Sequence, residues 1–197
     1  KRSASAGKPW QVLVQQVLMG NLATAPRLTE GLPADLPAYI RQRILAGAMA
    51  GRAELPLNMD AWDGYPAARE RVFRAALDAN ANLISLAGDT HNAWAFDLDH
   101  AGEKVGVEFG VQGVTSPGLE SYASYLPVDV LERETVAHNR QLKWMDGSRR
   151  GYMAVELTPA SASSEFRFVS SVREKGAGVN DTRRVSTHAG SRALDMG

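Results

Sequence analysis

An aspartate and a histidine stand two residues apart at the end of an apolar run in the stretch LISLAGDTHNAW, residues 83–94. Leu83 to Ala87 has the length and composition of a buried strand, and Gly88 allows a turn directly after it. Side chains at positions i and i+2 of an extended segment project to the same side, so we expect Asp89 and His91 to converge just beyond the strand. Ligand sites of α/β folds gather at the carboxyl ends of strands.

A carboxylate beside an imidazole at such a position has three interpretations. Asp89 and His91 can be two metal ligands, or one ligand and one acid–base group. The third interpretation is an ordinary turn, in which an aspartate follows a glycine and the histidine caps the loop. A metal site usually takes at least three protein ligands, so this pair is incomplete by itself.

The composition excludes several other classes of site. The 197 residues include 22 basic and 22 acidic side chains, and this balance predicts no nucleic-acid partner, which would require a basic excess. There is no cysteine, so the chain has no thiolate nucleophile and no cysteine zinc site. No apolar run approaches the ~18 residues of a membrane span. The opening KRSASAGKPW has no signal segment, and we therefore expect a processed or truncated chain.

Periodicity predicts an α/β chain that is β-rich toward its C-terminus. A helix is expected from Pro66 to Asn82, because Pro66 suits a first helical turn and an apolar stripe follows it. Other expected elements are a short, largely buried strand in 10–20, a helix at 38–52, a half-exposed strand at 104–113, a part-helical segment at 118–142 broken near Pro127, and two strands within 150–172. Residues 173–197 are polar and are expected to form a loosely ordered tail.

Several further residues have both a chemical and a structural interpretation. Arg149 and Arg150 could clamp a phosphate, or they could be surface residues at the start of a strand. Trp62 and Trp94 could line a substrate pocket, although core packing is the more frequent role of such aromatic residues. His100 lies in the polar stretch DLDHAGEK, which lacks the spacing of an EF-hand calcium loop and is interpreted as a hairpin turn.

Two motifs on either side of the predicted helix are typical of one family. DAWDGYPAARERV occupies residues 60–72, and LAGDTHNAWAFDL follows the helix. The order of these motifs resembles the PhoD-like alkaline phosphatase family of the metallophosphoesterase group, in which D-x-W-D-G-Y-x-x-x-R precedes a helix and G-D-x-H follows it. The matching residues are Asp60, Trp62, Asp63, Gly64, Tyr65, Arg69, Gly88, Asp89 and His91. Further similar segments extend the resemblance from about Trp10 to Val172.

The resemblance implies a fold in which this chain is only a part. Residues 1–172 would be the C-terminal half of a four-layer α/β/β/α metallophosphatase sandwich. The N-terminal half of the same domain would be the partner that supplies the remaining metal ligands. The family resemblance also implies a periplasmic or secreted protein.

The resemblance further implies metal-dependent hydrolysis of small-molecule or polymer phosphate esters, as in an alkaline phosphatase or phosphodiesterase, by a metal-activated water. The implied cofactors are iron(III) and calcium, and Asp89 stands where related enzymes have a histidine, which favours harder cations. Asp89 is the expected ligand, and His91 is either a ligand or a group that hydrogen-bonds the phosphate or leaving oxygen. Asp60 is either a further ligand or a turn residue, and Asp63 is expected to cap the helix. The alternative is a non-catalytic structural or binding half-domain.

Overall fold

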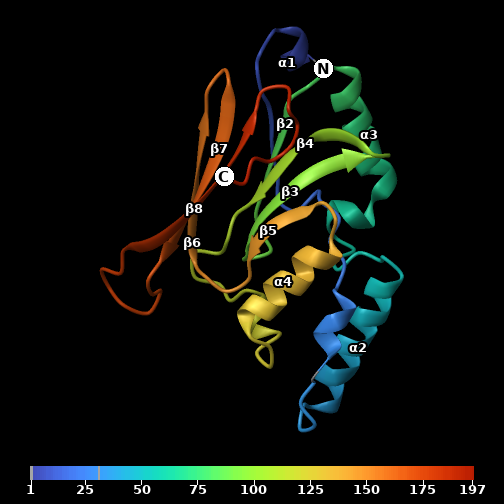
Figure 1. Ribbon diagram of the computed structural model, residues 1–197, viewed down its shortest axis with the longest axis vertical. Helices are drawn as coiled ribbons and strands as arrows, with labels where there is room; N and C mark the ends of the chain where they lie inside the picture. The colour runs from blue at the N-terminus through green and yellow to red at the C-terminus, as the bar shows by residue number, and fades with distance from the viewer. Residues whose placement is uncertain (1, 31) are drawn as a thin grey trace.

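The predicted strand Leu83–Ala87 is present as β2, inside a five-stranded sheet (Figure 1). The computed structural model describes residues 2–30 and 32–197. The strand order of this sheet is β1-β2-β4-β3-β5, with β1 at Gln11–Val14, β3 at Ala93–His100, β4 at Glu103–Gly110 and β5 at Leu142–Asp146. Because β1, β2 and β4 are parallel, the segments that follow these strands meet at one edge of the sheet.

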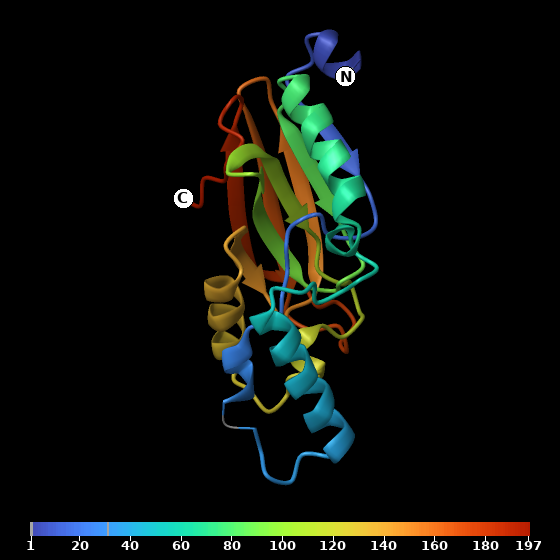
Figure 2. The same cartoon turned by 90° about the vertical axis from the view of Figure 1, so that its right-hand side faces the viewer.

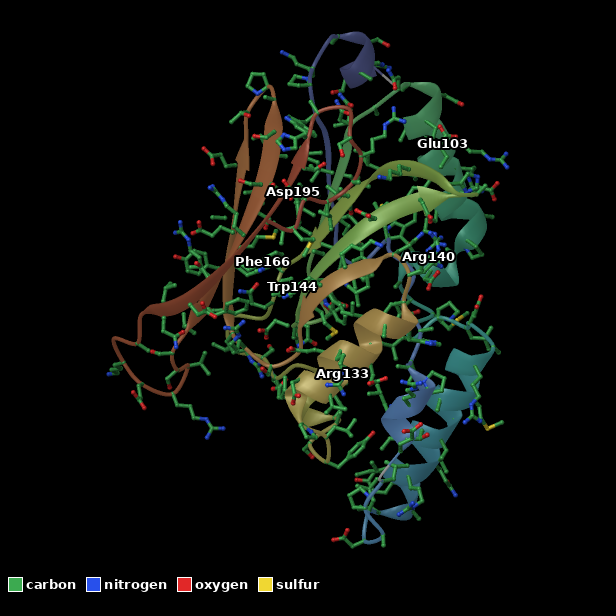
Figure 3. All side chains as sticks on the ribbon, in the orientation of Figure 1. Glu103, Arg133, Arg140, Trp144, Phe166 and Asp195 are labelled. Atoms are coloured by element: carbon green, nitrogen blue, oxygen red, sulfur yellow. The ribbon has the colours of Figure 1, made fainter. Side chains whose placement is uncertain are left out.

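A second sheet packs face to face against the first. It contains β6 (Gly151–Leu157), β7 (Ser161–Val169) and β8 (Val179–His188), which pair antiparallel in chain order. Phe166 and Phe168 of this sheet share one buried cluster with Ile84 and Phe109 of the first sheet. Figure 3 shows Trp144 beside Phe166 where the sheets meet, with ring centroids 5.0 Å apart. Contact between the two apolar faces therefore forms the inter-sheet core.

Helix α3 (Pro66–Asp78) covers the other face of the five-stranded sheet (Figure 2), where Phe73 and Ala76 are buried. Pro66 occupies the first turn, as predicted. The remaining helical segments are α1 (Arg2–Ser5), α2 (Ala38–Arg52) and α4 (Val128–His138), with 3-10 turns η1 (Pro26–Thr29), η2 (Trp62–Gly64) and η3 (Leu119–Ser121). Helices α2 and α4 lie together at one end of the molecule (Figures 1 and 2). No helix in the described part of the chain has the length and apolar character needed to cross a membrane.

The α/β class is confirmed, and the described residues form three layers: α3, the five-stranded sheet and the three-stranded sheet. The four-layer sandwich, of which this chain would be the C-terminal half, stays a prediction. Two expectations about strand exposure are wrong. The strand expected to be largely buried within 10–20 is the short edge strand β1, whose Val14 is 75% exposed. The strand expected to be half-exposed is β4, in which every residue from 105 to 110 is buried, because α3 and the second sheet cover its two faces.

The expectation of a loosely ordered tail at 173–197 is also wrong. Strand β8 lies in this segment and pairs with β7, and its Val185 and Thr187 are buried. Beyond β8, the N–H of Leu194 donates to Oδ1 of Asp97 at 2.7 Å, and Nε of Arg192 donates to the carbonyl of Ala81 at 3.0 Å. Pairing along the sheet stabilises this polar segment, although few of its side chains enter the core.

Glu108 of β4 is completely buried and binds the segment that follows β1. Its carboxylate accepts hydrogen bonds from the backbone N–H of Met19 at 2.8 Å, from that of Gly20 at 2.9 Å and from the hydroxyl of Ser85 at 2.8 Å. Burial raises the pKa of Glu108, and these donors oppose the rise because they stabilise the charged form. The carboxylate thus connects β4, β2 and the chain after β1.

Replacing Glu108 with alanine would leave these buried donors without their acceptor. We expect Glu108→Ala to lower the free energy of unfolding by about 3–5 kcal/mol, the usual cost of removing one member of a buried charged network. Urea denaturation followed by circular dichroism measures this change. The matched control is Glu156→Ala, which removes an exposed carboxylate paired with Arg184 and should cost less than about 1 kcal/mol. Equal losses in the two variants would contradict the assignment.

Candidate functional site

The stretch Gly88–His91 forms a tight turn at the carboxyl end of β2. The N–H of Thr90 donates to the carbonyl of Gly88 at 2.7 Å, and the φ angle of Asp89 between them is 65°. This three-residue turn with a positive central φ is the rare and strained form. His91 also has a positive φ, at 62°. The segment is therefore not extended, and the expectation that Asp89 and His91 project to the same side of an extended strand does not apply to it.

The carboxylate of Asp89 is exposed and faces the chain that follows β1. Nε2 of Gln16 donates to Oδ1 of Asp89 at 3.5 Å, and the N–H of Gly88 donates to the carbonyl of Gln16 at 2.9 Å. The turn after β2 is thus attached to the segment after β1, as the parallel pairing of these strands requires. Gln16 was not singled out from the sequence, because only the strand pairing brings it to Asp89.

The imidazole of His91 has one defined partner, the backbone carbonyl of Pro117 in the loop after β4. Nδ1 lies 2.9 Å from that oxygen. A carbonyl oxygen only accepts, so Nδ1 must carry a proton, and in the neutral ring Nε2 then has a free lone pair. Metal-binding histidines commonly donate their second ring N–H to a carbonyl in this way. The geometry therefore makes Nε2 the donor atom available to a metal or substrate.

Asp60, the third expected site residue, lies on a different loop. It is exposed in the turn before η2, where its backbone N–H donates a hydrogen bond to Oδ1 of Asn58 at 2.9 Å. Within residues 2–30 and 32–197, no group of three or more histidine, cysteine, aspartate or glutamate side chains is placed to hold a metal ion. Asp89 and His91 lie two residues apart on the same turn and face Gln16 and Pro117 respectively, and the structure does not join Asp60 to them in such a group.

The donor set of the turn fits part of a metal centre. An exposed carboxylate and a Nε2 lone pair are oxygen and nitrogen ligands of the kind that transition metals accept. Both groups occupy backbone conformations that cost about 1–3 kcal/mol each and are typical of functional sites. Two ligands are fewer than a protein metal site usually requires, so the described residues supply an incomplete set.

Comparison with known proteins identifies the family. A sequence model described as PhoD-like phosphatase matches residues 1–166. The chain belongs to the PhoD-like phosphatase family. Alkaline phosphatase D of Bacillus subtilis (strain 168) is 33% identical over 129 residues, which is 62% of this chain and 21% of that protein. A solved structure titled "Structure of PhoD" superposes with a TM-score of 0.69 at 22% identity, covering 98% of this chain and 32% of the other. The chain thus spans a third or less of the length of these relatives.

Within this PhoD-like chain, Asp63 has a different role from the helix cap that was expected. The first residue before α3 is Tyr65, and no side chain caps the helix there. Instead, Oδ1 of Asp63 accepts from Nη1 of Arg69 at 2.8 Å and from Nδ2 of Asn21 at 2.6 Å, while Oδ2 accepts from the N–H of Leu22 at 3.2 Å. Asp63 and Arg69 therefore connect α3 to the long loop after β1.

The other motif residues are mostly structural. Trp94 is buried and stacks on Phe96 in the core. Its indole N–H donates to the hydroxyl of Thr90 at 2.7 Å, so it stabilises the turn Gly88–His91, called the site turn below. His100 ends β3 at the β3–β4 hairpin, which confirms the expected turn. Arg149, whose side chain is 41% exposed just before β6, pairs with Asp146 and Asp181 and matches the surface interpretation. Arg150 is only 12% exposed and pairs with Glu120, so it is not a surface residue.

The side chains of Asp63 and Arg69 are only 10% and 13% exposed. The effect of removing Asp63 on the free energy of unfolding can distinguish this ion pair from a helix cap. Asp63→Ala should lower the free energy of unfolding by about 3 kcal/mol, because Arg69 loses its partner in a region with little water. Loss of a simple cap would cost about 1 kcal/mol. Chemical denaturation decides between these values, with Asp129→Ala on the exposed face of α4 as the control. A loss near that of the control would show that the pair has no such role.

Proposed function

We propose that this chain supplies part of the active site of a metal-dependent phosphoesterase that hydrolyses phosphate esters as an alkaline phosphatase or phosphodiesterase. The observation that carries the proposal is the His91 ring. Its Nδ1–H donates to the carbonyl of Pro117, which leaves Nε2 as a donor atom on the same turn as the Asp89 carboxylate. Family membership supplies the phosphatase chemistry that this turn would serve.

In the proposed site, Asp89 is a metal ligand, and His91 is a ligand or hydrogen-bonds the phosphoryl or leaving oxygen. A bound metal would offset the charge of the phosphoryl group and lower the pKa of a water so that hydroxide can attack phosphorus. Iron(III) with calcium is the proposed metal content, because a carboxylate favours harder cations. The strained turn holds Asp89 in place through Gln16, so the carboxylate needs little rearrangement on binding.

In this proposal the chain is part of a longer protein, and the test compares that longer parent protein with its Asp89→Asn variant. We expect the amide to lose bound metal, because it is a weaker ligand than a carboxylate for a hard cation. The kcat for p-nitrophenyl phosphate at alkaline pH should fall by at least the 10- to 100-fold that loss of an outer-sphere metal partner costs. Elemental analysis of the purified proteins measures the metal, and initial rates measure the hydrolysis.

Asp129→Asn provides the control for this experiment, since it changes an exposed carboxylate on α4, away from the site turn. Unchanged metal content and rate in Asp89→Asn would overturn the assignment of this residue. A parent protein with neither metal nor hydrolysis of mono- or diester substrates would favour the second candidate, a non-catalytic structural or binding half-domain. The observation that favours this second candidate is the lack of a third metal-binding side chain near the turn within the described residues.

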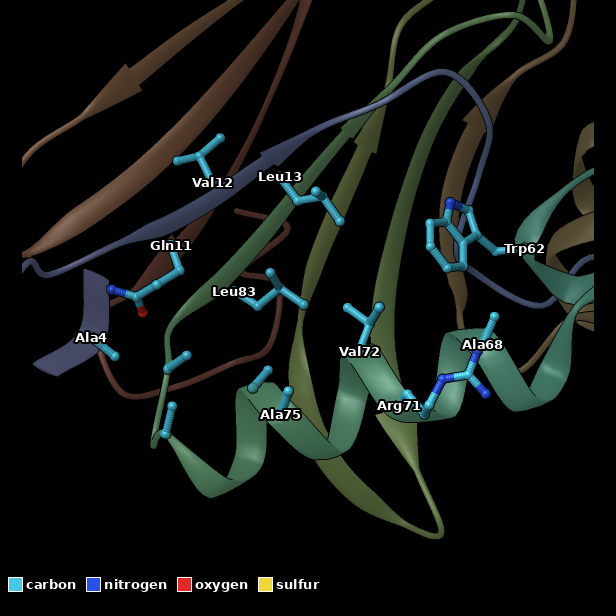
Figure 4. Close-up of a pocket in the computed structure, with 13 residues that line it drawn as sticks. Ala4, Gln11, Val12, Leu13, Trp62, Ala68, Arg71, Val72, Ala75 and Leu83 are labelled. Carbon is cyan, nitrogen blue, oxygen red and sulfur yellow. The ribbon is translucent and has the colours of Figure 1, made fainter. Parts of the chain in front are cut away.

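We further propose that the missing ligands come from the N-terminal half of the same four-layer domain, against which β1 packs. Val12 and Val14 of this edge strand lie beside Ile84 and Leu86 on the inter-sheet face and are exposed, although their neighbours join the buried core. On the opposite face, a groove of about 520 Å³ lies between β1 and α3, with Leu13 and Leu83 pointing into it and Val12 pointing away (Figure 4). The family resemblance also favours export to the periplasm or beyond.

Val14→Lys tests this arrangement. In the 197-residue chain the substitution should change the free energy of unfolding by no more than about 0.5 kcal/mol, since the side chain is largely exposed. In the longer protein it should cost at least about 2 kcal/mol, because a charge would be buried under the N-terminal half. Val172→Lys, at another exposed valine, is the control. Equal small effects of Val14→Lys in both proteins would exclude packing at this edge.

A further inference from the structure

The loop that holds the Pro117 carbonyl is attached to His91 of the site turn and to Asn92, the residue that follows this turn. Pro117 accepts from Nδ1 of His91 at 2.9 Å, and the N–H of Leu119 donates to Oδ1 of Asn92 at 3.1 Å. Asn92 is completely buried, so this second bond forms away from solvent. The position of the carbonyl relative to His91 therefore depends on the position of the whole 117–119 segment.

The same segment is also held by an ion pair between two residues outside the site turn. Glu120 pairs with Arg150, whose side chain is only 12% exposed, and Oε1 of Glu120 also accepts from the N–H of Gly118 at 3.2 Å. The N–H of Glu120 donates to the carbonyl of Gly147 at 3.2 Å. Arg150 is in the linker between β5 and β6, so the pair attaches the loop to the junction of the two sheets.

Gly118 shows how tightly the loop is packed between these two attachments. A Cβ atom at this position would lie 2.3 Å from Nδ2 of Asn92 and 2.9 Å from Oε2 of Glu120. Its φ of −103° is open to any residue, so space alone requires glycine here. The two atoms that face Gly118 are buried and make no hydrogen bond to the described residues. The loop thus has no room to approach Asn92 more closely.

We propose that Glu120 and Arg150 are positioning residues for the phosphoesterase site, which hold the Pro117 carbonyl so that the proton of His91 stays on Nδ1. The tautomer of a histidine is set by the hydrogen bond that its second nitrogen makes. If the carbonyl moves away, the proton can occupy Nε2 instead, and Nε2 then has no lone pair for a metal or a phosphoryl group. The importance of this tautomer for catalysis rests on the proposed function.

The test measures the tautomer directly, without metal or substrate. Nitrogen-15 chemical shifts of the His91 ring in the 197-residue chain are recorded at about pH 8.5, two units above the usual histidine pKa of ~6.5. We expect the Nδ1–H form to predominate in the parent. In Arg150→Met, which removes the cation, and in Gly118→Ala, which displaces the loop sterically, the Nε2–H form should become the major one.

Two further variants make the result specific. Arg150→Lys keeps the charge and should restore part of the Nδ1–H population, whereas Arg184→Met deletes an exposed arginine paired with Glu156 and should leave it unchanged. If the amide spectrum shows that Arg150→Met is unfolded, Glu120→Gln replaces it, since it removes the ion pair with little change in shape. A parent in which Nε2–H predominates, or folded variants that all keep the parent tautomer, would overturn the proposal.

The catalytic consequence is measured separately in the longer protein. Arg150→Met should lower kcat for p-nitrophenyl phosphate by 10- to 100-fold, as expected for a partner that orients a metal-binding histidine, with a smaller change in KM. Absence of hydrolysis in the parent would refute the proposed function and leave the tautomer result intact. A tautomer shift accompanied by an unchanged kcat would refute the positioning role, because the reaction would then not need the Nδ1–H form.

Discussion

Glu108 places a carboxylate where α3, the five-stranded sheet and the chain leaving β1 come together, and water does not reach it. Burial favours the neutral acid, whereas the N–H groups of Met19 and Gly20 and the hydroxyl of Ser85 favour the charged form. One of the side chains that fix the course of the chain after β1 is therefore 88 residues distant from Gly20.

That course determines what surrounds the site turn. After β1 the chain contacts Asp89 through Gln16, passes Glu108, and then reaches Asp63, which Arg69 holds against α3. The loop after β4 contributes the carbonyl that faces His91. Asp89 and His91 both have left-handed backbone conformations, which are higher in free energy than the usual ones. The segments that follow the parallel strands β1 and β4 contact them in these conformations. Contacts within the described residues are therefore sufficient to hold this turn in its conformation.

Local sequence signals were sufficient for elements that are decided locally. An apolar run after a helix with proline in its first turn predicted β2 and α3. Gly88 allowed for a turn after β2, but Asp89 and His91 were expected on one side of an extended segment, whereas both have positive φ angles. Burial was harder to predict, because alternation in β4 indicates one solvated face only if no second sheet covers it. Glu108 therefore resembled a surface residue. Strand β8 was missed for the opposite reason, since only Val185 and Thr187 among its mostly polar residues are buried. The partners of Asp63 and His91 lie on distant segments that only the sheet topology brings close.

The last residues of the chain complete a part of the fold that is made much earlier. The N–H of Gly190 donates to Oδ1 of Asn82, Arg192 donates to the carbonyl of Ala81, and the N–H of Leu194 donates to Asp97. This segment therefore lies along the edge of the sheet where β2 begins and β3 ends. During synthesis on the ribosome, the strands that carry the site turn are present about a hundred residues before these partners emerge. Until residues 190–194 emerge, the growing polypeptide therefore carries these strands without their later hydrogen-bond partners.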